Sequence, residues 1–291
     1  MRNYVIVTDS DTEIPYTFAD DHQIPVFLMP YTVNGEERLF DLGRNTDFKA
    51  FYQQLRDGAE AVTSTRPPTD IADFFREIVK DGVDVLYLCF SSALSGHFEL
   101  SQMARNMVLE EYPDARIEIV DTLKISMGAG QLVMAAQKLK EEGKTLDEVR
   151  DWVLKNRNRS HAWFSVDDLS YLRKGGRLSG AAAAIGTILD VKPILRINAE
   201  GKIVPVDKVK GTRKILKFFL VAIQDNVENP EEQTVFVMHA DNMDAALRMK
   251  EMIEESVPFA GIEIQDVGPV IGCHTGPGVL GVCFMGKEIT N

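Results

Sequence analysis

The sequence predicts an α/β fold with two parts: an N-terminal α/β/α region built on a parallel sheet, and a C-terminal α+β region built on a mixed sheet. Apolar strands alternate with helix-like segments through the first half, as in a parallel sheet joined by crossover helices. Those strands are almost continuously apolar, which is typical of strands buried on both faces. After about residue 160 this alternation gives way to a hairpin-like pair of strands and further helices, which indicates a mixed sheet.

The first half begins with an apolar strand, and two further strands are expected to join the same sheet. These strands are residues 4–7, 85–90 and 117–120. Segments with helical periodicity surround them, at residues 48–56, 70–80, 97–111, 129–141 and 146–158. Gly143 is interpreted as a helix C-cap. It opens a Gly-Lys-Thr sequence like the end of a phosphate-binding loop, but residue 138 is lysine where that loop has glycine, so no nucleotide site is expected.

The second half is expected to open with a strand at residues 162–166 and an alanine-rich helix near residues 179–189. Residues 192–210 form a hairpin candidate that turns at Glu200 and Gly201. The remaining elements are a helix at residues 212–225, a strand at 234–238 and a helix at 243–256. We therefore expect two domains, residues 1–160 and residues 161–291.

Composition limits the class of protein. The 291 residues are 45% hydrophobic and 26% charged, as in ordinary globular proteins long enough for two domains. No apolar run approaches the roughly 18 residues of a transmembrane helix, and the N-terminus leads directly into a strand, so a cytoplasmic protein is expected. The net charge of −12 argues against nucleic acid as the partner.

The three cysteines, Cys89, Cys273 and Cys283, have neither disulfide nor metal-site spacing, and the histidines lack such spacing too. Buried thiols are therefore expected, and no metal site is predicted.

Residues 271–281 form a glycine-rich, apolar segment with one side chain that ordinarily titrates near neutral pH, His274. Glycines allow a loop to approach a ligand closely, and a histidine carries the proton that switches near neutral pH. We interpret this segment as a loop that binds a small anion.

A second candidate anion site is the Ser-Ser-Ala-Leu-Ser-Gly sequence at residues 91–96, which lies between an apolar strand and a helix. Hydroxyl groups and helix N-termini both favour carboxylates and phosphates. Ser95 is the leading ligand candidate, although a plain capping role for this serine is equally compatible with the sequence. Thr8, Asp9 and Ser10 follow the first strand and are expected at the same sheet edge.

Together, several motifs resemble those of the DegV family, bacterial proteins that bind a single fatty acid. The matching segments follow the family's order through nearly the whole chain, at residues 7–10, 91–96, 120–122, 171–179, 239–242 and 274–278. The resemblance implies two α/β domains with an acyl chain buried between and within them. It also implies a long-chain fatty acid as the ligand, with no cofactor.

In this family, serine and threonine hydroxyls and a histidine hold the fatty acid carboxylate, so the resemblance assigns this role to Ser95 and His274. A Thr-Ser-Gln-Pro-Ser motif supplies a further hydroxyl, and here the sequence departs from it. Alignment on the proline places Ser64 in the threonine position, or Thr63 if the register slips. Two more hydroxyl candidates are Thr65 and Ser92. The chain also has His97 and Phe98 where relatives usually have threonine and tyrosine.

The apolar tail of the fatty acid would occupy a tunnel, and the residues that line this tunnel could equally form ordinary core. The candidates are Phe27, Met29, Ala181, Ala184, Ile185 and Ile188.

In the family, the bound acid is presented to a separate fatty acid kinase, which makes an acyl phosphate for phospholipid synthesis. The resemblance thus implies a carrier subunit that is not itself an enzyme, and transient contact with a membrane surface is compatible with this role. Residues 172–217 are strongly basic, although a charge run is often only a solvated face. We expect four of these basic residues to dock the kinase: Arg173, Lys174, Arg177 and Arg213.

Two other functions remain open from the sequence. Ser95, His274 and Asp9 have the residue types of a hydrolase triad, although no Gly-x-Ser-x-Gly motif surrounds the serine. Cys273 beside His274 is a weaker candidate nucleophile. A transcription regulator or other protein-binding module is the third class, but no convincing helix-turn-helix accompanies the acidic charge.

Overall fold

The computed structural model describes residues 3–178 and 191–290. It contains a parallel sheet with strand order β2-β1-β6-β7, which confirms the α/β prediction for the first half. Its strands are β1 (Tyr4–Asp9), β2 (Val26–Phe27), β6 (Asp84–Cys89) and β7 (Ile117–Asp121). Every strand pair is parallel, and Ile6 of β1 faces Leu86 of β6.

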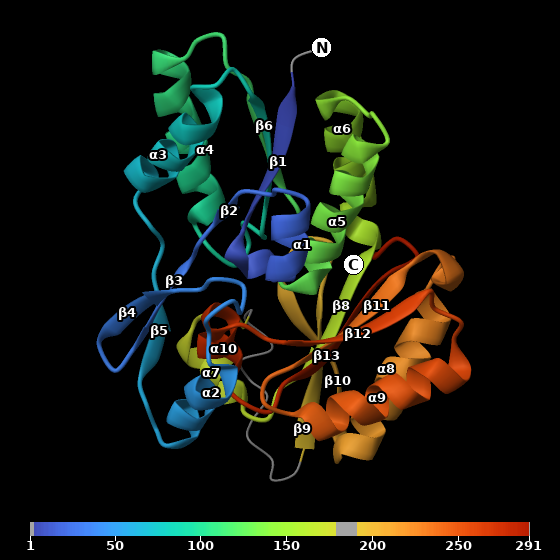
Figure 1. Cartoon of the computed structure of the whole chain (residues 1–291). Coiled ribbons are helices and arrows are strands. Elements are labelled where there is room, and N and C mark those ends of the chain that lie inside the picture. The colour runs from blue at the N-terminus through green and yellow to red at the C-terminus, as the bar shows by residue number, and fades with distance from the viewer. Residues whose placement is uncertain (1–2, 179–190, 291) are drawn as a thin grey trace.

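Helices cover both faces of this sheet (Figure 1). One face carries α3 (Pro68–Val79) and α4 (His97–Glu111), and the other carries α5 (Met127–Glu141) and α6 (Leu146–Asn156). Alternate residues of the strands point to opposite faces of the sheet. Ile6 and Leu88 pack with α5 and α6, while Val85 and Tyr87 pack with α3 and α4. The continuous apolar strands of the sequence arise from this double burial.

A three-stranded antiparallel sheet interrupts the first half and was not predicted. Its order is β4-β3-β5, with strands β3 (Pro30–Val33), β4 (Glu36–Leu39) and β5 (Ala61–Thr63). The turn between β3 and β4 is formed by Asn34 and Gly35, both with positive φ. An Asn-Gly pair between short strands is a strong hairpin signal, so the sequence did contain a cue for this sheet. The neighbouring elements are η1 (Ser10–Thr12), α1 (Tyr16–Asp21) and α2 (Phe48–Arg56).

The second half forms a mixed sheet, as predicted, and its six strands have the order β10-β9-β8-β13-β11-β12. The strands are β8 (Ser160–Ser165), β9 (Val191–Ile197), β10 (Ile203–Lys210), β11 (Thr234–His239), β12 (Gly261–Asp266) and β13 (Leu280–Met285). β11 and β12 are parallel, and the other pairs are antiparallel. One face is covered by α8 (Thr212–Asn226) and α9 (Met243–Ser256) (Figure 1). The shorter elements are η2 (Arg157–Arg159), α7 (Leu169–Lys174) and η4 (Pro230–Glu232).

The predicted hairpin between β9 and β10 is confirmed, and its tip connects the two large sheets. Gly201 has a φ of +78°, and the Ser91 hydroxyl donates a hydrogen bond to its carbonyl at 2.9 Å. A Cβ on Gly201 would lie 2.2 Å from that hydroxyl oxygen, so glycine is required here for both reasons. The predicted alanine-rich helix at residues 179–189 lies outside the described residues.

The expected loop at residues 271–281 is partly wrong, because α10 (Pro269–Thr275) includes its first five residues. Pro269 occupies the first helical turn and Gly276 ends the helix with a φ of +72°, which are ordinary start and stop signals. α10 packs against α7 and β5. The helix therefore joins the small sheet of the first half to the second half, across the boundary that we propose near residue 160. None of the helices in the described part of the chain combines the length and hydrophobicity needed to cross a membrane.

Candidate functional site

A cavity of about 500 Å³ lies on the face of the mixed sheet opposite α8 and α9. Met238, Cys283 and Ile197 line it from this sheet, and Phe90 and Ile125 line it from loops that follow the parallel strands. α10, the last residue of β5 and the two residues after it (63–65) complete the wall. Most of the lining is apolar, and the polar side chains described below are the exceptions.

His274 anchors one polar group of this cavity. It lies in the last turn of α10, and its Nε2 is 2.7 Å from the Thr63 hydroxyl at the end of β5. Its Nδ1 is buried and has no hydrogen-bond partner in the described part of the chain. Burial, with a smaller contribution from the nearby Arg177 guanidinium, lowers the pKa of His274 to about 4. The imidazole is therefore neutral at pH 7 and does not supply a positive charge to the cavity.

Arg177 supplies that charge instead. Its Nε donates a hydrogen bond of 3.0 Å to the Leu94 carbonyl, and its Nη1 donates to the Gly175 carbonyl. The side chain lines the cavity and is half-buried, and burial lowers its pKa. Sequence reasoning assigned Arg177 to partner docking, because nothing in a linear run of basic residues distinguishes the one that folds inward.

Gly175 determines how closely α7 and α10 approach. A Cβ at this position would lie 2.2 Å from the Nδ1 of His274, although the backbone φ of −70° suits any residue. Glycine is thus required by the close approach of the imidazole and not by its backbone conformation. Because Arg177 donates to the Gly175 carbonyl, the same glycine connects the histidine to the arginine.

Ser95 also lines the cavity, next to the Leu94 carbonyl that Arg177 binds. Its hydroxyl oxygen accepts a hydrogen bond of 3.2 Å from the backbone N–H of His97, in the first turn of α4. That bond uses the oxygen as an acceptor and leaves the hydroxyl proton available to a ligand. The capping and binding roles that the sequence left open are therefore compatible.

Ser64 and Thr65 line the cavity and are also exposed, so they mark its mouth. Thr63 is the hydroxyl that contacts His274, which favours the slipped register of the sequence alignment for this contact. Thr63, Ser64, Ser95, His274 and Arg177 therefore surround the same cavity.

The other predicted residues differ in where they lie. Ser92 is not among the cavity-lining residues, because its hydroxyl donates a 2.6 Å hydrogen bond to Asp121. Phe27 packs in the core, stacked on His97 and beneath the Arg66 guanidinium, whereas Met29 does line the cavity. The remaining predicted tunnel residues lie outside the described residues: Ala181, Ala184, Ile185 and Ile188. Arg173, Lys174 and Arg213 are exposed, the first two at the end of α7 and the third at the start of α8.

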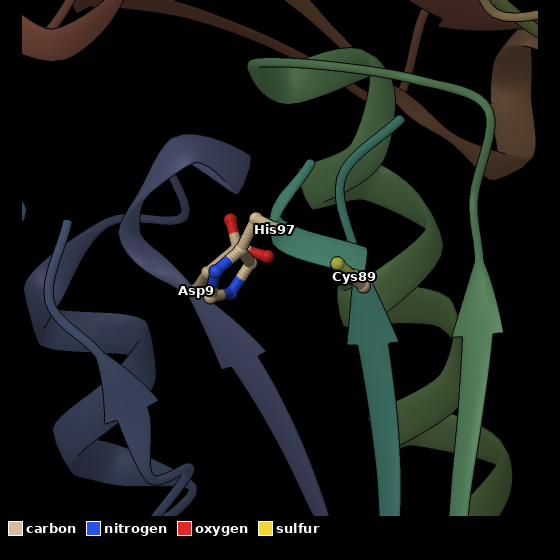
Figure 2. A group of neighbouring side chains, drawn as sticks. All are labelled: Asp9, Cys89 and His97. Carbon is tan, nitrogen blue, oxygen red and sulfur yellow. The ribbon is translucent and has the colours of Figure 1, made fainter. Parts of the chain in front are cut away.

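Sequence spacing gave no indication that Asp9, Cys89 and His97 come together, yet their ligand-type atoms lie within 4.8 Å of one another (Figure 2). The Tyr87 hydroxyl joins two members of this buried group. It lies 2.7 Å from Nε2 of His97 and donates a 3.2 Å hydrogen bond to Asp9. We therefore interpret the group as a hydrogen-bonded network that supports the turn before α4, because the tyrosine hydroxyl already occupies one Asp9 oxygen and Nε2 of His97.

The triad expected for a hydrolase is not formed. The Asp9 carboxylate accepts hydrogen bonds from Tyr87 and from the backbone N–H groups of Phe90 and Asp11, while His274 is bonded to Thr63. Burial raises the pKa of Cys273 to about 12, so its thiol is protonated and a poor nucleophile. Without an oriented base or a thiolate, neither nucleophile is activated.

Fold and site together define a class of α/β proteins in which a parallel and a mixed sheet enclose an apolar cavity with hydroxyl, imidazole and guanidinium groups. The model of a family described as "Uncharacterised protein, DegV family" matches residues 3–287. A DegV domain-containing protein from Clostridium perfringens is 41% identical over 286 residues, which cover 98% of each chain. The chain belongs to the DegV family.

Solved structures agree with this assignment. The chain is similar to a DegV family protein from Thermus thermophilus, whose structure is described as showing fatty acid binding, with a TM-score of 0.86 and 28% identity. It is similar to a fatty acid binding DegV family protein from Streptococcus agalactiae, with a TM-score of 0.86 and 26% identity. In both comparisons 99% of this chain and 100% of the other chain are covered.

Proposed function

We propose that this protein binds one long-chain fatty acid in the cavity and presents its carboxylate to a separate fatty acid kinase. The observation that carries the proposal is the chemical division of the cavity, which combines an apolar wall with a cluster of hydroxyl, imidazole and guanidinium groups. A fatty acid has the same division. The fatty acid binding described for the similar proteins from Thermus thermophilus and Streptococcus agalactiae supports this ligand class.

The carboxylate is proposed to lie among Thr63, Ser64, Ser95, His274 and Arg177. An ionised carboxylate buried without partners would cost several kcal/mol, so its oxygens need strong donors. A neutral His274 donates through Nδ1 when the Thr63 hydroxyl donates to Nε2, and the distance of 2.7 Å permits that arrangement. Arg177 supplies the charge, and charge-assisted hydrogen bonds are about twice as strong as neutral ones.

The acyl chain is proposed to fill the apolar part, between Phe90, Leu172 and the inner face of the mixed sheet. Burying one methylene contributes about 0.8 kcal/mol, so a chain of roughly fifteen contributes on the order of 12 kcal/mol before binding costs are subtracted. This gain supports tight binding and slow release of a ligand with no other polar group.

The kinase partner is proposed from the resemblance to the DegV family, because in that family a separate protein phosphorylates the bound acid. Arg173 and Lys174 are exposed at the end of α7, the helix whose Leu172 lines the cavity. Basic side chains at this position can attract an acidic protein surface or offset the charge of a developing acyl phosphate. Arg213 at the start of α8 is proposed as a further docking residue.

Native mass spectrometry of the purified protein tests the ligand, followed by solvent extraction and identification of the released compound. We expect one adduct with the mass of a single long-chain fatty acid, or uptake of added palmitate or oleate by the delipidated protein. If the protein shows no adduct and takes up no added fatty acid, the proposal is refuted. For the kinase, Arg173→Glu should slow acyl phosphate formation by a fatty acid kinase while the lipid content stays unchanged, and an unchanged rate would exclude docking through Arg173.

A further inference from the structure

Asp11 is an unusual residue for the wall of an acyl cavity. It lies in η1, directly after β1, and its side chain lines the cavity and is only 4% exposed. Its Oδ1 has no hydrogen-bond partner in the described part of the chain. The two acidic residues beside it differ: Asp9 accepts three hydrogen bonds, and Glu13 accepts bonds from Ser126 and from the backbone of Gly268. Buried polar atoms without partners are rare, so Asp11 requires an explanation.

Arg177 is the charged group that favours the ionised form of the Asp11 carboxyl. Its guanidinium lowers the pKa of the Asp11 carboxyl, against the larger upward effects of burial and of the Asp9 and Glu13 carboxylates. Nevertheless, within residues 3–178 and 191–290 no hydrogen bond joins the two side chains, although both line the cavity. Arg177 uses Nε and Nη1 on the carbonyls of Leu94 and Gly175, and a guanidinium has five N–H groups. The cavity thus contains an unpaired acceptor and a donor with remaining capacity.

We infer that Asp11 and Arg177 form a subsite for a hydroxyl group on the ligand, and that the protein prefers long-chain acids hydroxylated close to the carboxylate. A hydroxyl combines a donor for Asp11 Oδ1 with an acceptor for Arg177, which neither a methylene nor a second carboxylate does. The inference rests on the proposed function and specifies its ligand class.

The position of the hydroxyl along the ligand follows from the partners of Arg177. This side chain binds the carbonyls of Leu94, next to Ser95, and of Gly175, whose Cα lies against His274. It therefore lies among the groups proposed to hold the carboxylate. A hydroxyl that reaches Arg177 and Asp11 must be on one of the first carbons of the chain, which identifies 2-hydroxy and 3-hydroxy acids as the ligand class.

An ordered water molecule could also satisfy Asp11, and the binding experiment distinguishes the two explanations. Dissociation constants are measured for palmitate, 2-hydroxypalmitate, 3-hydroxypalmitate and 16-hydroxypalmitate on the delipidated full-length protein. At least one of the 2- and 3-hydroxy acids should bind about three- to tenfold more tightly than palmitate, the effect of one good hydrogen bond. The 16-hydroxy acid should bind more weakly than palmitate, because its hydroxyl enters the apolar part.

Asp11→Ala should abolish the preference for the hydroxy acid and change palmitate affinity less than about threefold, since the Asp11 side chain makes no hydrogen bond in the described part of the chain that would be lost. Thr275→Val is the matched control. Thr275 lines the same cavity, but its hydroxyl already donates to the Ile271 carbonyl, so the preference should survive this change.

Three results would overturn the inference while leaving fatty acid binding intact: neither hydroxy acid binds more tightly than palmitate, the preference persists in Asp11→Ala, or Asp11→Ala weakens all four ligands equally. The first result is the one that an ordered water predicts, and the last would mean that Asp11 contacts the carboxylate itself. If no acid binds to the wild-type protein, the proposed function fails and the inference fails with it.

Discussion

Gly175→Ala is the most direct test of the proposed carboxylate site, because it directs a single methyl group at the Nδ1 atom of His274. The new Cβ would lie 2.2 Å from Nδ1 of His274, whereas ordinary contacts begin at 3.4 Å. The imidazole must therefore move by about 1 Å, and a displacement of that size is enough to misalign a reacting or binding group. Both the bond to Thr63 and the donor offered to the ligand depend on the present position of the ring.

The expected loss is that of one hydrogen bond to a charged group, about 1.5–3 kcal/mol, or roughly a 10- to 150-fold weaker dissociation constant. Isothermal titration of the delipidated protein with palmitate measures it. The fold itself should remain, because the φ of −70° and ψ of −12° at this helix C-cap accept alanine without strain. The melting temperature without ligand should therefore change little.

Gly96→Ala is the matched control, since Gly96 has a φ of −74° beside the same cavity and a Cβ there would meet nothing within 4 Å. It should leave palmitate affinity unchanged. A double-mutant cycle completes the test: once His274→Ala has removed the ring, adding Gly175→Ala should cost no further affinity. The reasoning would be refuted if Gly175→Ala bound palmitate as tightly as the wild type. It would also be refuted if Gly175→Ala weakened palmitate binding as much in the His274→Ala background as in the wild type.

Two further predictions concern buried polar groups. Burial raises the pKa of Glu13 from 4.5 to about 7, so the folded protein holds a proton that the unfolded chain has released, and stability should fall as pH rises from about 5 to 8. Urea denaturation at both pH values should show that Glu13→Gln reduces this fall by on the order of 3 kcal/mol; an equal pH dependence in the variant would contradict it. Tyr87→Phe should lower the free energy of unfolding by about 1–3 kcal/mol, because Asp9 and His97 lose the hydroxyl they share. Added Zn²⁺ should leave the wild-type melting temperature unchanged, and a rise would show that the Asp9, Cys89 and His97 group binds metal instead.

Local signals explain which elements were predictable. The helix at residues 48–56 and the helix at 97–111 end where periodicity predicted, and the strands of the parallel sheet were visible as continuous apolar runs. The small antiparallel sheet was missed because its strands are three or four residues long and β4 is exposed along its whole length. Strands that bury little apolar surface leave little periodicity in the sequence.

The site was predictable in its residue types but not in its assembly. Ser95 and His274 could be identified from motifs, whereas the inward orientation of Arg177 depends on carbonyl acceptors at Leu94 and Gly175, one from each half of the chain. Carbonyl acceptors have no side-chain signature. The separation of Ser92 from the cavity likewise depends on a single partner, Asp121, at the end of a neighbouring strand. Sequence patterns report periodicity and residue type, but such partner choices are made in three dimensions.

The chemistry of the polar end of the cavity supports the proposal of a carboxylate ligand over a neutral one. Burial disfavours the positive charge of Arg177, and its two assigned hydrogen bonds are to uncharged carbonyls. The carboxyl group that attracts it most directly, Asp11, is itself held towards its neutral form by burial. A ligand carboxylate would therefore bring the counter-charge that neither carbonyl provides, and its affinity includes the relief of a partly buried cation. A fatty alcohol of equal length would bury the same methylenes but leave the guanidinium without that partner, so the proposal predicts that the alcohol binds more weakly than the acid.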